Sequence, residues 1–384
     1  MIVRKFAVAV KLLFGLLAVA CFFLPARSMA QGYVFEAAFQ QQTETNPLIL
    51  IQVAVNGSQP AWFVFSTSSD LALVLNENYK GITVKETGES LKVDGSIALK
   101  KLESAKIAVK ASPADLEANV QNAYRGPLKN LDDFYGKGKI AGIIGGDITH
   151  FFKIAIDFDA AKIKFGINST LEDMNFKGLA KAQKLKLEQG MVSNIAPVVK
   201  IRTEKEKDYF GVIDTSIANS QFTEGLMKTY AIKKSKLPEV APDLALFDVT
   251  DFQLAGKKQA VIAYQVPDAG RTSLGLGFLK NFNILLDYKN QELYLAPREV
   301  SLKQSGSSGF TVVEKDGKFV VDNVSKEFSG SEAIQAGDEI VVEGELTLQQ
   351  VLTKLDGSVG QEQELKVRRK GEVKTLKYKP ISLF

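Results

Sequence analysis

The fold is decided by the stretch Ala61-Trp62-Phe63-Val64-Phe65-Ser66-Thr67-Ser68 and by its counterpart Tyr209-Phe210-Gly211-Val212-Ile213-Asp214-Thr215-Ser216. Each is an apolar run, typical of a strand, that ends in a polar triplet with threonine at its centre. Another apolar run precedes each, at residues 48–55 and 196–201. Asn56-Gly57 follows the first run of the first pair and supplies a turn signal. The chain therefore contains a duplicated pair of strands.

The duplication continues downstream, where residues 143–158 align without a gap with residues 273–288. Each copy reads as a glycine turn, a short helix and a strand that ends on an aspartate followed by an aromatic residue. These aspartates, Asp157 and Asp287, are predicted to begin turns rather than to act in chemistry. A further strand follows in each copy. The pattern predicts two similar β units that cover each other's apolar faces.

This order of features resembles a lobe of the retropepsin and pepsin-type aspartic proteases, over roughly residues 47–165 and 192–297. The resemblance implies an all-β-dominated fold with two duplicated lobes, lobe 1 at 31–170 and lobe 2 at 192–298, joined by an interlobe linker at 171–191. It also implies that Asp214 is the catalytic aspartate of lobe 2. The same resemblance implies that Thr67 and Thr215 bond across to the opposite loop and brace the lobes.

Ser66 stands where the resemblance implies the first catalytic aspartate. The chemistry of that family needs two carboxyls that share one proton, and a serine hydroxyl does not titrate near neutral pH. The loss predicts a weak or absent protease, because general acid–base participation is worth about 10²–10⁴-fold. Asp70 is the alternative acid, but its use would require a shift of the whole strand register. An ordinary turn aspartate is the alternative interpretation of Asp214.

Two further serines, Ser68 and Ser216, replace the glycine that the family places at the end of the triplet. Glycine permits backbone torsions that serine resists. The close approach of the backbone behind the carboxylate is therefore an open point of the resemblance.

The C-terminal part of the chain, after a linker at 299–308, resembles a PDZ domain of the α+β class over residues 309–384. The most specific match is Ala336-Gly337-Asp338-Glu339-Ile340. The resemblance implies a groove that binds a peptide as an added strand and receives its terminal carboxylate. Its expected peptide-binding residues are Gly309, Phe310, Thr311, Val312 and Val351. A closed or unused groove is the alternative.

The first 30 residues of the 384 have the pattern of an export signal, with basic residues, an apolar run and a small-x-small ending at Ala30. They carry four of the 48 basic side chains and none of the 44 acidic ones, so a mature chain would carry 44 of each. A near-neutral chain predicts no nucleic-acid partner. Cys21, the sole cysteine, lies in the signal and is a lipidation candidate; membrane attachment is expected only if it is lipidated or the signal is uncleaved.

Other chemistries lack their residues. His150 is the only histidine, and it is predicted to be an exposed or capping residue. No Gly-x-Ser-x-Gly or His-Glu-x-x-His pattern occurs, so neither a metal nor a cofactor is expected.

The sequence therefore predicts a periplasmic or secreted, catalytically impaired protein that binds extended polypeptides, C-terminal peptides among them. The alternatives are an active aspartic endopeptidase that uses Asp214 and recruits substrate through its PDZ module, and a structural envelope protein.

Overall fold

The computed structural model of the chain describes residues 32–40, 47–93, 97–188, 195–202, 208–230, 232–234, 246–254, 257–268, 270–298, 306–324, 333–356 and 360–382. The predicted signal peptide, Cys21 and most of the linker predicted at 299–308 lie outside these ranges. Strands account for 49% and helices for 10% of the structure, which confirms the all-β-dominated class. No helix within these ranges is long and apolar enough to span a membrane.

The first unit is built on a nine-stranded sheet with the order β5-β6-β9-β4-β10-β3-β2-β7-β8. Its elements are β2 (Leu50–Val55), β3 (Ala61–Phe65), β4 (Leu73–Asn76), β5 (Glu86–Val93), β6 (Ile97–Leu102), β7 (Ala105–Val109), β8 (Leu116–Val120), β9 (Ala123–Gly126), α2 (Lys129–Tyr135), β10 (Gly142–Ile144) and α3 (Gly146–Thr149). The predicted hairpin is confirmed, because β2 pairs with β3. Asn56 (φ 51°) and Gly57 (φ 75°) form a left-handed turn at the start of the connection, where the N–H of Ser58 donates to the Val55 carbonyl at 3.0 Å.

The second unit is built on a seven-stranded sheet with the order β14-β15-β20-β16-β19-β18-β17. Its elements are β14 (Val198–Arg202), β15 (Asp208–Ile213), β16 (Ser220–Thr223), α4 (Glu224–Met227), β17 (Ile232–Lys234), β18 (Leu246–Leu254), β19 (Lys257–Val266), β20 (Ser273–Leu274) and α5 (Leu276–Leu279). Strand β20 is parallel to β15 and antiparallel to β16, as β10 is parallel to β3 and antiparallel to β4. The sequence repeat is therefore a repeat of strand arrangement.

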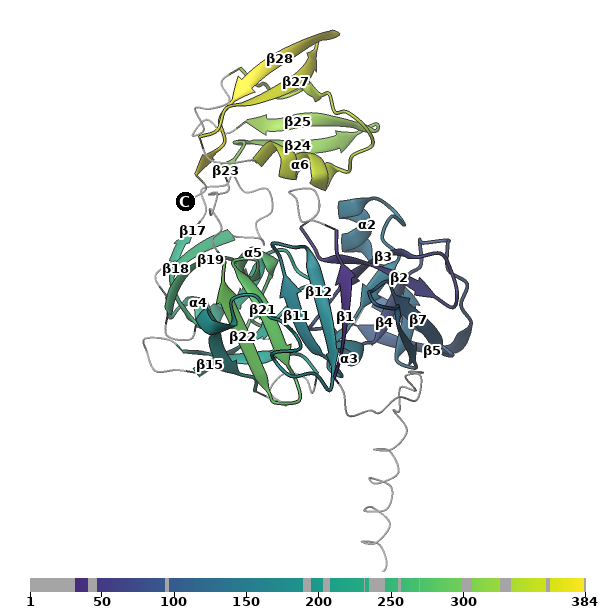
Figure 1. Cartoon of the computed structure of the whole chain (residues 1–384). Helices are drawn as coiled ribbons and strands as arrows, with labels where there is room; N and C mark the ends of the chain where they lie inside the picture. The colour runs from purple at the N-terminus through teal and green to yellow at the C-terminus, as the bar shows by residue number, and fades with distance from the viewer. Residues whose placement is uncertain are drawn as a thin grey trace, which may run out of the picture.

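A six-stranded sheet, in the order β1-β12-β11-β21-β22-β13, joins the two units (Figure 1). Its strands are β1 (Tyr33–Ala38), β11 (Lys153–Asp157), β12 (Lys162–Ile167), β13 (Gln183–Lys186), β21 (Phe282–Asp287) and β22 (Glu292–Pro297). The 3-10 helix η1 (Leu179–Lys181) precedes β13 in the chain. At its centre β11 pairs antiparallel with β21, so the closing strands of the two repeats are direct neighbours. The antiparallel pairing connects the first and second units through backbone hydrogen bonds.

Lys153 and Asp287 form an almost fully buried ion pair across β11 and β21. Burial raises the pKa of Asp287, but the hydrogen bonds from Lys153 and Asn290 lower it by more. As predicted, both aspartates of the repeat begin turns. Asp157 Oδ1 accepts the N–H of Asp159 at 2.9 Å, and Asp287 Oδ1 accepts the N–H of Asn290 at 3.1 Å.

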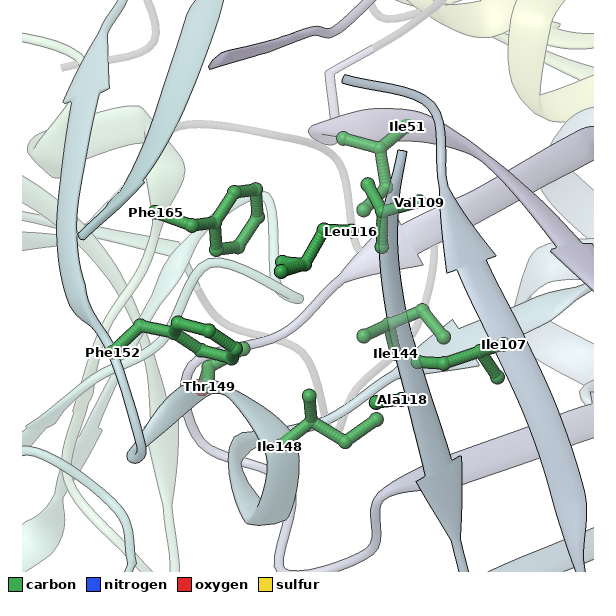
Figure 2. A pocket seen from close by; sticks show the side chains of 10 residues that line it. All are labelled: Ile51, Ile107, Val109, Leu116, Ala118, Ile144, Ile148, Thr149, Phe152 and Phe165. Carbon is green, nitrogen blue, oxygen red and sulfur yellow. The ribbon is translucent and has the colours of Figure 1, made fainter. Parts of the chain in front are cut away.

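The core of the first unit contains aromatic edge contacts, with Phe165 lying 5.9 Å from Phe65 and 5.7 Å from Phe152 between ring centres. Beside these rings lies a void of about 10 Å³ with an almost entirely apolar lining. Figure 2 shows aliphatic and aromatic side chains from the facing strands and α3 pointing into it. A water needs two or more polar partners, so this void is a packing gap rather than a ligand site.

The C-terminal unit has a five-stranded sheet in the order β24-β25-β26-β27-β28 and a separate pair, β23 and β29. Its elements are β23 (Gly306–Ser307), β24 (Phe310–Lys315), β25 (Lys318–Val324), β26 (Glu339–Ile340), α6 (Leu348–Asp356), β27 (Gln363–Arg369), β28 (Glu372–Tyr378) and β29 (Ile381–Ser382). A hydrophobic cluster of its own forms the core. The buried Asp338 is held by a two-pronged ion pair, in which Arg369 Nε and Nη2 each lie 2.6 Å from a carboxylate oxygen.

The C-terminal unit contacts the first unit where α6 packs against α2 (Figure 1). Thr347 lies just before α6 and accepts the N–H of Gln350 at 3.3 Å, while its own N–H donates to Gln350 Oε1 at 3.1 Å. This is a capping box. The same hydroxyl donates to the carbonyl of Phe134, in α2, at 2.6 Å. Thr347 therefore both caps α6 and binds it to the first unit.

Candidate functional site

Two buried turns meet where the first and second units adjoin. Ser66-Thr67-Ser68 follows β3, and Asp214-Thr215-Ser216 follows β15. The N–H of Ser66 donates to Ile144 O, in β10, at 2.8 Å; the N–H of Asp214 donates to Leu274 O, in β20, at 3.0 Å. In each unit, the strand that runs parallel to the one before the turn accepts this hydrogen bond, so both turns are held in the same way. Ser66 and Asp214 occupy equivalent places in the two sheets.

The two threonines bind the turns to each other. Thr67 Oγ1 donates to Ile213 O at 2.6 Å, and Thr215 Oγ1 donates to Phe65 O at 2.8 Å. Each hydroxyl also accepts the N–H of the other threonine, at 3.1 and 3.3 Å. Both threonines are fully buried. Four hydrogen bonds of Thr67 and Thr215 therefore join the two turns.

Ser66 makes the same local hydrogen bond as Asp214. Ser66 Oγ accepts the N–H of Ser68 at 3.3 Å and that of Ser69 at 3.2 Å. Asp214 Oδ1 accepts the N–H of Ser216 at 2.9 Å. The serine thus preserves the turn, because a hydroxyl can accept these bonds as a carboxylate does. It does not preserve the charge.

The serines that end the triplets adopt ordinary backbone torsions, since neither Ser68 nor Ser216 has a positive φ. The turns therefore do not require glycine. Ser216 instead uses its side chain, because its Oγ donates to Asp214 Oδ1 at 2.6 Å. Ser68 Oγ lies 3.5 Å from Ser66 Oγ.

Arg271 contacts Asp214, although no motif in the sequence indicates this contact. Its Nη2 lies 3.4 Å from Asp214 Oδ2, and the two side chains are 36% and 4% exposed. Arg271 precedes β20, at the position where the aligned first repeat has Ala141. The sequence distinguishes Arg271 only by this difference between the two repeats, a cation in one copy and alanine in the other. An arginine stays protonated and cannot share a proton with a carboxyl group, so this pair cannot act as an acid dyad.

The alternative acid, Asp70, is exposed, and its backbone carbonyl accepts a hydrogen bond from Asn122 at 3.0 Å. The strand pairing places Ser66, not Asp70, at the position equivalent to Asp214. His150 follows α3 as its C-cap, and its Nδ1 lies 3.1 Å from Gly146 O. The capping role predicted for His150 is therefore confirmed.

The residues expected to form the C-terminal groove lie together around the edge strand β24. Gly309 has a φ of 78° and precedes the strand, which pairs with β25 on one side and is contacted by α6. Phe310, Val312 and Val351 are buried in the core of this unit, while Thr311 is half-buried. Their apolar surface is therefore covered in this structure.

No family model matches the chain, and no curated protein matches it. Within the ranges that the structure describes, no group of three or more histidine, cysteine, aspartate or glutamate side chains is arranged to hold a metal ion.

Proposed function

We propose that this chain is an exported polypeptide-binding protein with two lobes of the aspartic-protease type and a PDZ-like C-terminal module, in which efficient peptide hydrolysis has been lost. The repeated strand arrangement and the threonine brace support the assignment to this architecture. The signal-like residues 1–30 support action in the periplasm or outside the cell.

The observation that carries the proposal is that two equivalent turns hold Ser66 in one and, in the other, an Asp214 that is bound to Arg271. Hydrolysis by an aspartic dyad needs one carboxyl as base and the other as acid. Here one turn offers a hydroxyl, and the carboxylate of the other accepts bonds from a guanidinium and from Ser216. Retention of the turns without the acid pair favours a role in binding.

The C-terminal unit supplies a second, independent argument for the proposal. Strand β24 is the first strand of its sheet, so it offers an edge to which an extended peptide could add. Helix α6 lies beside it, as a PDZ-like groove requires. Because Phe310, Val312 and Val351 are buried, a ligand would have to move α6 away from β24 to reach them.

The test is the retention of peptides by the mature full chain, residues 31–384. A random peptide pool is passed over immobilised protein, and bound peptides are identified by mass spectrometry. We expect recovery of intact peptides, with a free terminal carboxylate favoured over the matched amide. Absence of any retained peptide would overturn the proposed function, whereas equal retention of acid and amide would overturn only the PDZ-like role.

A further inference from the structure

We infer that Arg271, which contacts the Asp214 turn, binds the polypeptide directly and recognises a carboxylate group on it. The carboxylate can belong to an acidic side chain or to the end of the chain. The inference rests on the proposed function and adds the chemical class of ligand that the site selects.

Asp214 itself is closed to a ligand. Its Oδ1 accepts both the N–H and the hydroxyl of Ser216, at 2.9 and 2.6 Å, and its Oδ2 faces Arg271. Its side chain is only 4% exposed, whereas that of Arg271 is 36% exposed. A molecule that approaches from solvent therefore meets the guanidinium and not the carboxylate beneath it.

The guanidinium has donors to spare. It carries five N–H donors in a planar fork, and within the described part of the chain its hydrogen bonding is to Asp214 alone, through Nη2. Asp268, the acid nearest to it in sequence, is engaged elsewhere, since its Oδ1 accepts the N–H of Gly225 at 2.6 Å. The remaining donors suit a carboxylate, which such a fork binds through two parallel hydrogen bonds.

The charge of the two turns makes this selection feasible. A second ionised carboxylate at the position of Ser66 would outweigh the single positive charge of Arg271 and would disfavour an acidic ligand. With Ser66 in one turn, the charges of Asp214 and Arg271 cancel, and the exposed member is the cation. Asp214 thus acts as a positioning residue that holds the guanidinium in place.

The test uses fluorescein-labelled octapeptide amides that differ only by Glu or Gln at one position, scanned along the peptide, with binding to the mature full chain measured by anisotropy. A third peptide carries Gln and a free C-terminus. The variants are Arg271→Gln, Arg271→Lys, which keeps the charge but loses the fork, and Arg125→Gln. Arg125 lies on β9, donates to the Glu77 carbonyl at 3.3 Å, and controls for the loss of one positive charge. Urea unfolding checks that each variant is folded.

We expect at least one Glu peptide to bind about tenfold more tightly than its Gln partner, because hydrogen bonds to charged groups are the stronger ones. The preference should disappear in Arg271→Gln, weaken in Arg271→Lys and persist in Arg125→Gln. A terminal-carboxylate preference that survives in Arg271→Gln belongs to the C-terminal unit. Equal binding of Glu and Gln peptides by the wild type, or an unchanged preference in Arg271→Gln, overturns the inference while leaving the proposed function intact. Failure of every peptide to bind overturns both.

Discussion

Thr67 and Thr215 exchange equivalent hydrogen bonds across the boundary between the first two units. Each hydroxyl donates to the carbonyl two residues before the other threonine and accepts the other threonine's N–H. The exchange is local and symmetric, although Ser66 and Asp214 beside it differ in charge. The connection between the units therefore does not require an acid in both turns.

Substitution of Thr67 by valine should lower the free energy of unfolding by about 1–3 kcal/mol. Valine has nearly the same shape, but it leaves the buried Ile213 carbonyl and Thr215 N–H without their hydroxyl partner. Urea denaturation of the mature chain measures the change. Thr67→Ser, which keeps the hydroxyl, is the matched control and should lose less. A Thr67→Val protein as stable as the wild type would show that the brace contributes nothing.

The double variant Thr67→Val/Thr215→Val should lose less stability than the two single variants added together. The two hydroxyls lie 3.5 Å apart, and the effects of substitutions at contacting residues of this kind are not additive. The same urea series gives the coupling energy. Strict additivity would mean that the two hydrogen-bond pairs act independently.

Substitution of Ser66 by aspartate should create peptide cleavage at acidic pH, because it places a second carboxyl in the turn equivalent to that of Asp214. The gain should be greater in Ser66→Asp/Arg271→Gln, since Arg271 no longer occupies Asp214 Oδ2. General acid–base catalysis sets the expected scale, about 10²-fold or more over the parent. A quenched fluorescent peptide library reports the rate, and Ser68→Asp is the control. Cleavage equal in Ser66→Asp and Ser68→Asp would contradict the equivalence of the two turns.

Acid should destabilise the C-terminal unit through Asp338. Burial raises the pKa of this carboxyl, but the hydrogen bonds from Arg369 and the Gln335 N–H lower it by more, so the folded pKa lies below the unfolded value. The stabilisation is therefore complete above the unfolded pKa of about 3.9 and is lost as the pH falls through the folded pKa.

Hydrogen exchange of residues 306–382 between pH 6 and pH 3 measures this effect. The Asp338→Asn variant should be less stable at pH 6, by roughly 3 kcal/mol because Arg369 loses its charged partner, and should show a smaller further loss on acidification. An unchanged pH response in Asp338→Asn would assign the acid sensitivity to other groups.

Disruption of the Thr347 contact should release the C-terminal unit from the first unit. Thr347→Asp keeps an acceptor for the helix cap but removes the donor to the Phe134 carbonyl, whereas Thr347→Ser keeps both. Small-angle scattering should report a larger radius of gyration for Thr347→Asp alone. The same radius for all three proteins would show that this hydrogen bond does not hold the units together.

Much of the fold could be predicted because its determinants are local. Asn56-Gly57 specifies its hairpin through torsions that few other residue pairs adopt, and the repeat identifies equivalent strands. The pairing of β11 with β21 could not be predicted this way. A repeat shows which strands correspond, but not which of them share hydrogen bonds.

The site was predictable to the same extent. The turns of Ser66 and Asp214 follow from the repeat, because strand and triplet match in both copies. Arg271 breaks the repeat, and its contact with Asp214 depends on how the chain enters β20. The bond between Thr347 and Phe134 joins residues 213 positions apart with no shared motif, so it could come only from the structure.

The most direct test of the central claim is a cleavage time course at pH 3 to 7 with the mature wild-type chain and a peptide pool, followed by mass spectrometry. Asp214→Ala is run in parallel, because it removes the remaining carboxylate. The account predicts that the peptides retained by the wild type are recovered uncut and that the two proteins give the same product spectrum. Cleavage by the wild type that disappears in Asp214→Ala would show that the protein is a working aspartic protease and would contradict the account.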